Sequence, residues 1–174
     1  TLADLLVRCD PQVVGIVVAH LSGALPQRRL GVGFRSLGSP PPAASEPSLT
    51  VREVDEAFQR LAATAGAGSG ATRRAELDSL MGRATDGEQG FLRGLITGTL
   101  RQGALDGVVL QAISLAYAVP ERVVRRAVML AGHASAVAQV AATGGTAALE
   151  QVGLVVGRPL RPMLAASATT PEDA

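Results

Sequence analysis

Two short passages of the sequence combine a helix-ending glycine with arginine and further glycines. GALPQ at residues 23–27 and GTLRQ at residues 98–102 lie 75 positions apart, and five of twenty positions are identical when residues 14–33 are aligned without gaps on residues 89–108. Glycine lets a backbone approach a ligand closely, arginine makes charge-assisted bonds to phosphate oxygens, and free amides at a helix start attract phosphate. The pattern predicts two phosphate-binding turns. The alternative is two ordinary helix-connecting turns with solvated arginines.

Ten residues are candidates for this chemistry. They are Arg28, Arg29, Gly31, Gly33 and Arg35 in the first passage and Arg93, Arg101, Gln102, Gly103 and Asp106 in the second. Because phosphates carry no base information, two such turns would hold a nucleic-acid backbone without regard to its sequence.

The charge distribution agrees with this interpretation. Residues 1–45 carry four arginines and two acidic residues, a net +2, and residues 91–165 carry seven arginines and three acidic residues, a net +4. Residues 46–90 carry five arginines and eight acidic residues, a net −3. The formal total is only +1, yet both arginine–glycine passages lie in basic segments. This asymmetry is typical of an anion-binding face on a nearly neutral protein.

We find no pattern for catalysis or metal binding. All 16 basic residues are arginine, a bias that we attribute to a GC-rich genome. Whatever its cause, the absence of lysine excludes a lysyl nucleophile, a Schiff base and a phosphate-loop lysine in this chain. The two histidines, His20 and His133, lie far apart on apolar helical patterns and are expected to be core residues. Cys9 is expected to be a small buried apolar residue, and no metal-ligand spacing occurs. The chain is therefore predicted to be non-catalytic by itself, with no catalytic residue, metal or cofactor.

The elements that must position the candidates are helices. Apolar residues at helical spacing, with glycines and prolines between, predict an all-α fold of about eight or nine helices. The expected starts are an Asp10 cap, a Thr50–Glu53 capping box, a Ser69 cap, an Asp86 cap with Gln89 and a start at Pro120. The expected helical ranges are residues 13–21, 51–61, 71–83, 86–97, 108–117, 123–131, 133–142 and 146–151, and residues 154–156 are expected to form a short strand.

Length and composition fit one helical domain or two small ones. Apolar residues make up 47% of the 174 residues and aromatic residues only 2%, so the core must consist of Leu, Val and Ala. A single cysteine excludes an intramolecular disulfide and fits a reducing compartment. No apolar run has the length of a membrane span, and we see no signal peptide.

Five stretches together resemble the N-terminal DNA-binding domain of bacterial ATP-dependent DNA ligases. They are LSGALPQRRLGVG (21–33), LTVREVDEAFQRLAATAGAGS (49–69), FLRGLITGTLRQGALDGVVLQAI (91–113), VVRRAVMLAGHASAVAQVA (123–141) and VGRPLRPMLA (156–165). They cover nearly the whole chain, and LRQGALDGVV and GRPLRPMLA are the most specific.

The resemblance implies an all-helical domain of two pseudo-symmetric halves. It places a DNA-binding domain at 1–157, with possible halves 1–45 and 46–157 and a truncated N-terminus, and a linker at 158–174 toward an absent nucleotidyltransferase domain. Arg158 and Arg161 in that linker either contact DNA or flank the hinge. In the family's glycine pattern Gly33 pairs with Gly103, whereas the ungapped alignment pairs Gln27 with Gln102. We prefer the glycine pairing for function.

The resemblance further implies the partner and the wider reaction. This domain would lie across the minor groove of nicked duplex DNA, beside catalytic and OB-fold domains of the same protein that use ATP and Mg²⁺. Repair, replication and recombination in the cytoplasm, at the nucleoid, are the implied setting. The alternative function is a helical protein–protein interaction module with a basic face, but such modules present aromatic or Leu-rich grooves, and this chain has few aromatic residues. A stand-alone hydrolase lacks a nucleophile–base pair.

Overall fold

The computed structural model describes residues 1–100 and 105–160, and of Arg35, Leu105 and Asp106 it describes the backbone only. Eight α-helices and one 3₁₀ helix lie in these ranges, and no strand does, which confirms the all-α class. The helices are α1 (Leu2–Arg8), α2 (Val14–Leu21), α3 (Val51–Ala63), α4 (Ser69–Arg83), α5 (Asp86–Thr97), α6 (Leu105–Ala116), α7 (Glu121–Ala131) and α8 (Ala134–Glu150), and the 3₁₀ helix η1 spans Phe34–Leu37.

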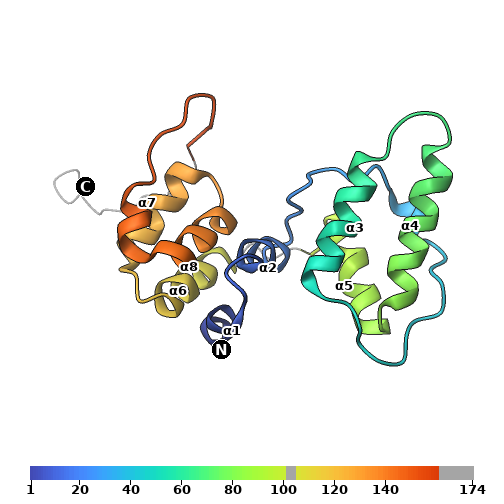
Figure 1. Ribbon diagram of the computed structural model, residues 1–174, viewed down its shortest axis with the longest axis horizontal. Helices are drawn as coiled ribbons and strands as arrows, with labels where there is room; N and C mark the ends of the chain where they lie inside the picture. The colour runs from blue at the N-terminus through green and yellow to red at the C-terminus, as the bar shows by residue number, and fades with distance from the viewer. Residues whose placement is uncertain (101–104, 161–174) are drawn as a thin grey trace, which may run out of the picture.

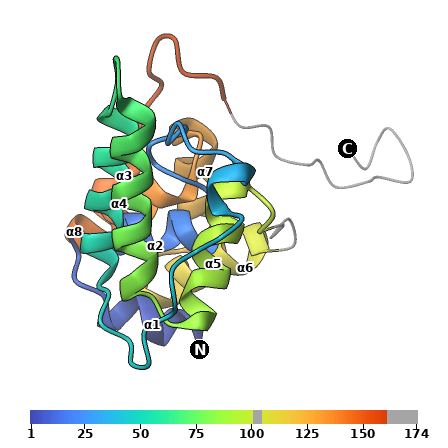
Figure 2. The ribbon, with the colours of Figure 1, turned by 90° about the vertical axis from the view of Figure 1, so that its right-hand side faces the viewer.

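Two separate hydrophobic cores divide the molecule into two lobes. The terminal lobe consists of α1, α2, α6, α7 and α8, and the inserted lobe consists of η1, α3, α4 and α5. Figure 1 shows the lobes side by side, with α2 between the rest of the terminal lobe and α3. Figure 2, turned to place the inserted lobe in front, shows the segment after α8 rising above both lobes.

The cores follow the composition. Leu, Val, Ala and Ile fill the terminal core, and Phe58 is the one aromatic residue in either buried cluster. Residues 1–45 contribute to both cores, with Leu6 and Val18 in the first and Leu30 and Leu37 in the second. The boundary between the cores therefore does not follow the predicted division at residue 45, because the chain leaves the terminal lobe after α2 and returns at α6.

Local helix signals agree with the sequence in part. The Thr50–Glu53 capping box is present on α3, and Pro120 immediately precedes α7. Gly98 and Gly132 follow α5 and α7 in the left-handed conformation, and α8 is kinked at Gly145 where a break between two helices was predicted.

Four local predictions were wrong. Asp10 does not cap α2; its carboxylate accepts from the Gln12 amide at 2.8 Å and shapes the preceding turn. The residue preceding α4 is Gly68, and the Ser69 hydroxyl instead accepts from Arg73. Thr85, with Glu88, caps α5 one residue ahead of the predicted Asp86. Residues 154–156 form no strand, since they run exposed away from either core with no neighbour to pair with among the described residues.

None of the helices in the described part of the chain has the length and apolarity needed to cross a bilayer.

Candidate nucleic-acid interface

The two similar passages share one backbone geometry where their helices end. Gly23 and Gly98 have φ of +68° and +69°. In the first passage the Gly23 amide donates to the His20 carbonyl and the Ala24 amide donates to the Ala19 carbonyl. The same two bonds recur 75 positions later, around Gly98. This pair of bonds satisfies carbonyls at a helix end and requires a left-handed residue, which glycine adopts at little cost. The two passages are thus similar in backbone structure as well as in sequence where their helices end, at Gly23 and Gly98.

The first passage forms an exposed loop that is tied to the inserted lobe. Arg28 and Arg29 are both exposed, and Arg28 has a positive φ of 61°. The amide of Gln27, next to them, donates to the buried Asp55 carboxylate on α3 at 2.7 Å. The loop that carries the two arginines is therefore fixed at its base while its guanidinium groups face solvent.

The two candidate glycines of this loop have different surroundings. A Cβ on Gly31, which has φ +68°, would lie 2.6 Å from Nε of Arg73. Glycine at position 31 therefore suits the left-handed backbone conformation, and it also leaves room for the Arg73 guanidinium group. A Cβ on Gly33 would have nothing within 4 Å. Of the two, only Gly33 leaves open space beside the backbone, as the prediction of a close ligand approach requires.

The second passage is described in part. Arg93 lies half-buried on α5, and its buried Nε has no hydrogen-bond partner among the described residues. Asp106 is the second residue of α6, as expected of a helix start. The predicted residues Arg101, Gln102 and Gly103 lie outside the described residues, so the pairing of Gly33 with Gly103 stays a prediction.

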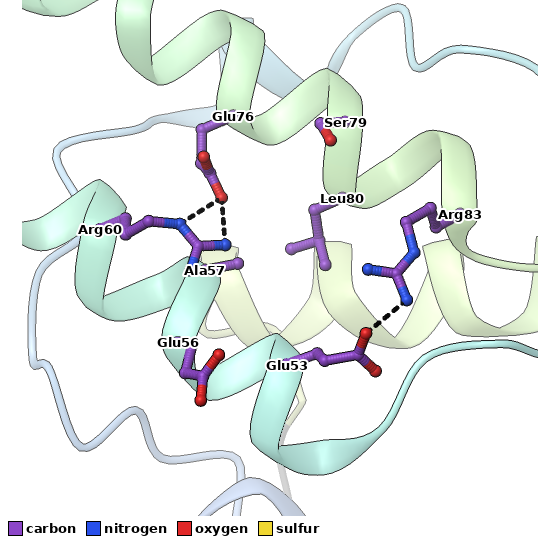
Figure 3. A pocket seen from close by; sticks show the side chains of 8 residues that line it. All are labelled: Glu53, Glu56, Ala57, Arg60, Glu76, Ser79, Leu80 and Arg83. Carbon is purple, nitrogen blue, oxygen red and sulfur yellow. Dashed lines mark hydrogen bonds and ion pairs between the residues drawn. The ribbon is translucent and has the colours of Figure 1, made fainter.

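The arginines of the acidic segment, residues 46–90, are engaged within the protein. Four of them form ion pairs: Arg52 with Asp10, Arg60 with Glu76, Arg74 with Asp78 and Arg83 with Glu53. The fifth, Arg73, donates to the carbonyls of Leu61 and Thr64 at the end of α3. Figure 3 shows the pairs of Arg60 and Arg83 crossing between α3 and α4 on either side of Leu80, around a cavity of about 210 Å³.

These ion pairs shift the pKa values of Glu53 and Arg60. The hydrogen bond from Arg83, followed by those from Thr50, lowers the pKa of Glu53 to about 2. The hydrogen bond to Glu76 raises the pKa of Arg60. The two arginine side chains of these pairs are about half exposed, so the pairs add little stability, but they reduce the positive charge on this face.

The other exposed arginines behave differently. No ion pair within the described residues involves Arg28, Arg29, Arg122 or Arg158. Arg125 is paired with Glu121, and Arg126 donates to the carbonyls of Glu150 and Val152. Within the acidic segment every arginine is bound to an acidic group or a carbonyl of the protein, whereas Arg28, Arg29, Arg122 and Arg158, which have no ion pair in the described part of the chain, lie outside that segment.

Two of these arginines meet at a cavity that the sequence did not indicate. Arg28 and Arg158 line a volume of about 420 Å³ together with residues 131–133, Pro159 and Leu160. His133 precedes α8, its side chain is exposed, and it makes no capping bond to the helix. The first amides of α8 thus have no side-chain cap, and such amides favour anions. The expectation that His133 is a core residue was wrong, because the glycine before it ends α7 and turns the chain outward.

His20, in contrast, is buried as expected. It is 6% exposed and packs edge-on against Phe58 with ring centroids 5.9 Å apart. Burial lowers its pKa, and the charge of Asp55 opposes that shift. Cys9 is half-buried against the terminal core. Among the described residues no cluster of His, Cys, Asp or Glu is suited to hold a metal ion.

The sequence of this chain is similar to those of known proteins over nearly its whole length. Residues 30–114 match the family described as DNA ligase N terminus. A probable DNA ligase of Nocardioides is 54% identical over 96% of this chain and 34% of its own length. Probable DNA ligases of Mycolicibacterium vanbaalenii and Streptomyces griseus are 53% and 50% identical over 95% and 99% of this chain, and over 31% and 34% of their own lengths. The chain thus spans about a third of the length of these relatives. It belongs to the family of N-terminal domains of bacterial DNA ligases.

Proposed function

We propose that this chain binds nicked duplex DNA through the phosphate backbone, as the DNA-binding domain of an ATP-dependent ligase. The observation that carries the proposal is the division of its arginines. Those of the acidic segment are bound to acidic groups or carbonyls of the protein itself, whereas Arg28, Arg29 and Arg158 face solvent without an acidic partner among the described residues. Guanidinium groups presented in this way suit phosphate oxygens.

The binding mode follows from the types of group involved. Arginines and open backbone at Gly33 contact phosphates, which fix the position of a duplex without reading its sequence. A ligase must act at a break in any sequence, so this indifference suits the proposed role. The two similar helix ends at Gly23 and Gly98 would present their loops to successive stretches of backbone.

The chemistry of strand joining lies outside these residues. The whole chain contains no lysine, so it cannot carry the lysyl–AMP adduct that the resemblance to ATP-dependent ligases implies. ATP and Mg²⁺ would be used by further domains of the full protein, and this chain would hold the substrate for them. In repair, replication and recombination alike, the substrate offered would be a nicked duplex.

Fluorescence anisotropy with labelled nicked duplexes of unrelated sequence tests the proposal. Affinity should be equal for all duplexes and should fall steeply with salt, with a slope of about 0.9 in the logarithm per phosphate neutralised. Replacing both Arg28 and Arg29 with Ala should reduce that slope by up to about two phosphates. Arg60→Ala is the matched control, because Arg60 is paired with Glu76 and should not contribute.

Two results would count against the proposal. The first is an absence of binding at low salt, which would redirect attention to a protein partner for the basic face. The second is a change of sequence preference in the Arg28 and Arg29 variant, since phosphate contacts cannot produce one.

A further inference from the structure

Phe34 is the exception among the aromatic residues of this chain. The sequence has three Phe and one Tyr. Phe58 is fully buried, Tyr117 is half-buried with its hydroxyl donating to the Leu6 carbonyl, and Phe91 is partly covered. Phe34 is 78% exposed. A protein this poor in aromatic residues leaves one of them almost wholly in water, which gives up the burial that such side chains ordinarily provide.

The backbone that carries Phe34 is held in place. Phe34 is the first residue of η1, and Leu37, the last, is 4% exposed and packs into the inserted core. The Ser36 amide donates to the Gly33 carbonyl at 3.0 Å. Arg74 on α4 donates to the carbonyls of Ser36 and Ser39 at 3.3 and 3.0 Å. The ring is thus presented to solvent by a turn that is anchored by the residues directly after it, so little order must be gained when it meets a partner.

The neighbours of Phe34 indicate the partner. Within six residues before it stand Arg28 and Arg29, both exposed, and the open backbone of Gly33 directly precedes it. The apolar residues close by in sequence, Leu30 and Leu37, are turned into the core. Phe34 is therefore the one strongly exposed apolar side chain of residues 28–37, and it directly follows the groups that we propose to bind phosphate. A hot spot for a protein partner would instead sit within a desolvated apolar surround.

We propose that Phe34 inserts its ring into the minor groove of the duplex whose phosphates the Arg28–Gly33 loop contacts. This inference rests on the proposed function and adds an apolar contact to it. Proteins that bind the minor groove commonly place an apolar side chain there among arginine contacts to the backbone. The pattern of base edges in this groove is degenerate, so such a contact is compatible with binding that ignores sequence.

The test separates the ring from the charges by their salt dependence. Phe34→Ala should weaken binding of this chain to nicked duplexes of every sequence by about tenfold, the order expected when an aromatic contact to nucleic acid is lost. Because no phosphate contact is removed, the slope of affinity against salt should not change. Phe34→Trp should retain most of the affinity. Arg28→Ala, in contrast, should reduce the slope of affinity against salt, because it removes a phosphate contact.

Leu115→Ala is the matched control, since Leu115 is also an exposed apolar side chain, 67% accessible, but lies on α6 away from the loop. It should leave affinity unchanged. The inference is overturned if Phe34→Ala binds as the wild type does, or if its salt slope falls as in Arg28→Ala. Equal binding by Phe34→Ala would favour a protein partner for the ring while leaving the DNA-binding function standing. Loss of binding by the wild type would instead refute that function, so the two failures are distinguishable.

Discussion

Gly23 lies directly against the backbone of Leu100. A Cβ on Gly23 would overlap the Leu100 carbonyl oxygen and lie 3.4 Å from the Leu100 Cβ. Gly23 follows α2, where the chain leaves the terminal lobe. Leu100 follows α5, the last helix of the inserted lobe before the chain returns to the terminal lobe at α6. The two crossings between the lobes are therefore packed together, and the two similar passages of the sequence meet at this point.

Gly23→Ala should therefore destabilise the fold more than the same change at Gly98. Both glycines have nearly the same positive φ, so alanine costs about 1–2 kcal/mol at either position. At Gly23 the methyl group also collides with Leu100, whereas a Cβ on Gly98 meets nothing within 4 Å. Urea unfolding should show at least about 1 kcal/mol of additional loss for Gly23→Ala. Equal losses would mean that the crossing contact contributes nothing.

Asp55 should couple the stability of the inserted lobe to the position of the arginine loop. Asp55 is 6% exposed, and its carboxylate accepts from the side-chain amides of Gln27 at 2.7 Å and Gln59 at 2.6 Å. Asp55→Ala should cost about 2 kcal/mol in urea unfolding, because it leaves the Gln27 amide without its carboxylate partner. It should also weaken DNA binding, since Gln27 then no longer ties the adjacent Arg28 to α3.

Glu56→Ala is the control for that change. Glu56 is the next residue of α3, is exposed, and forms no ion pair within the described residues. Its replacement should alter stability by less than about 0.5 kcal/mol and leave DNA affinity intact. A large loss for Glu56→Ala, or none for Asp55→Ala, would show that the buried carboxylate is not what holds the loop.

His20 should make the fold less stable as the pH falls below about 6.5. Burial lowers its folded-state pKa below the ordinary value of 6.5, so between the two values the unfolded chain binds the proton and the folded chain does not. The free energy of unfolding should then fall with decreasing pH by up to about 1.4 kcal/mol per unit across that window. Urea unfolding between about pH 7 and 5 measures this, and His20→Leu should flatten the profile.

Glu53 also makes stability depend on pH, but in a lower pH range than His20 does. The pKa of Glu53 is lowered to about 2, so its contribution to stability is present above its ordinary value of 4.5 and is lost as the pH falls toward 2. A profile for wild type that is flat between about pH 7 and 5 would contradict the assignment to His20.

Sequence reasoning predicted local features better than it predicted the site. Helix class, the Thr50–Glu53 box and the glycine after α5 follow from neighbours along the chain, and the structure confirms them. The cap of α5 was predicted one residue too late. Thr85–Glu88 and Asp86–Gln89 are both plausible caps, and sequence alone does not separate two overlapping patterns.

Features that depend on distant contacts were not predictable from the sequence. Gly31 is predicted as a place where a ligand approaches, yet it also makes room for Arg73, which is 42 positions away and packs there only in the folded protein. Likewise, the net charges of the segments do not indicate which arginines of the acidic segment form ion pairs. The passages GALPQ and GTLRQ indicate two helices that end in a similar way. They do not indicate that Gly23 lies against Leu100.

Arg28 and Arg158 should act on the same phosphate group. They come from opposite ends of the chain and line one cavity of about 420 Å³ beside the uncapped start of α8. Arg158→Ala should weaken binding to nicked duplex several-fold and lower the salt slope by up to about one phosphate. Arg125→Ala is the control, because Arg125 is already paired with Glu121 on α7.

A double-mutant cycle then decides whether the two arginines share a ligand. If one phosphate lies between them, the loss of affinity in the double variant should differ from the product of the two single losses, because neighbouring groups on one ligand are not independent. Independent effects would place Arg158 on a separate phosphate. No effect of Arg158→Ala at low salt would leave the segment after α8 as a connection only, and the phosphate contacts would then belong to the loop of Arg28 and Arg29.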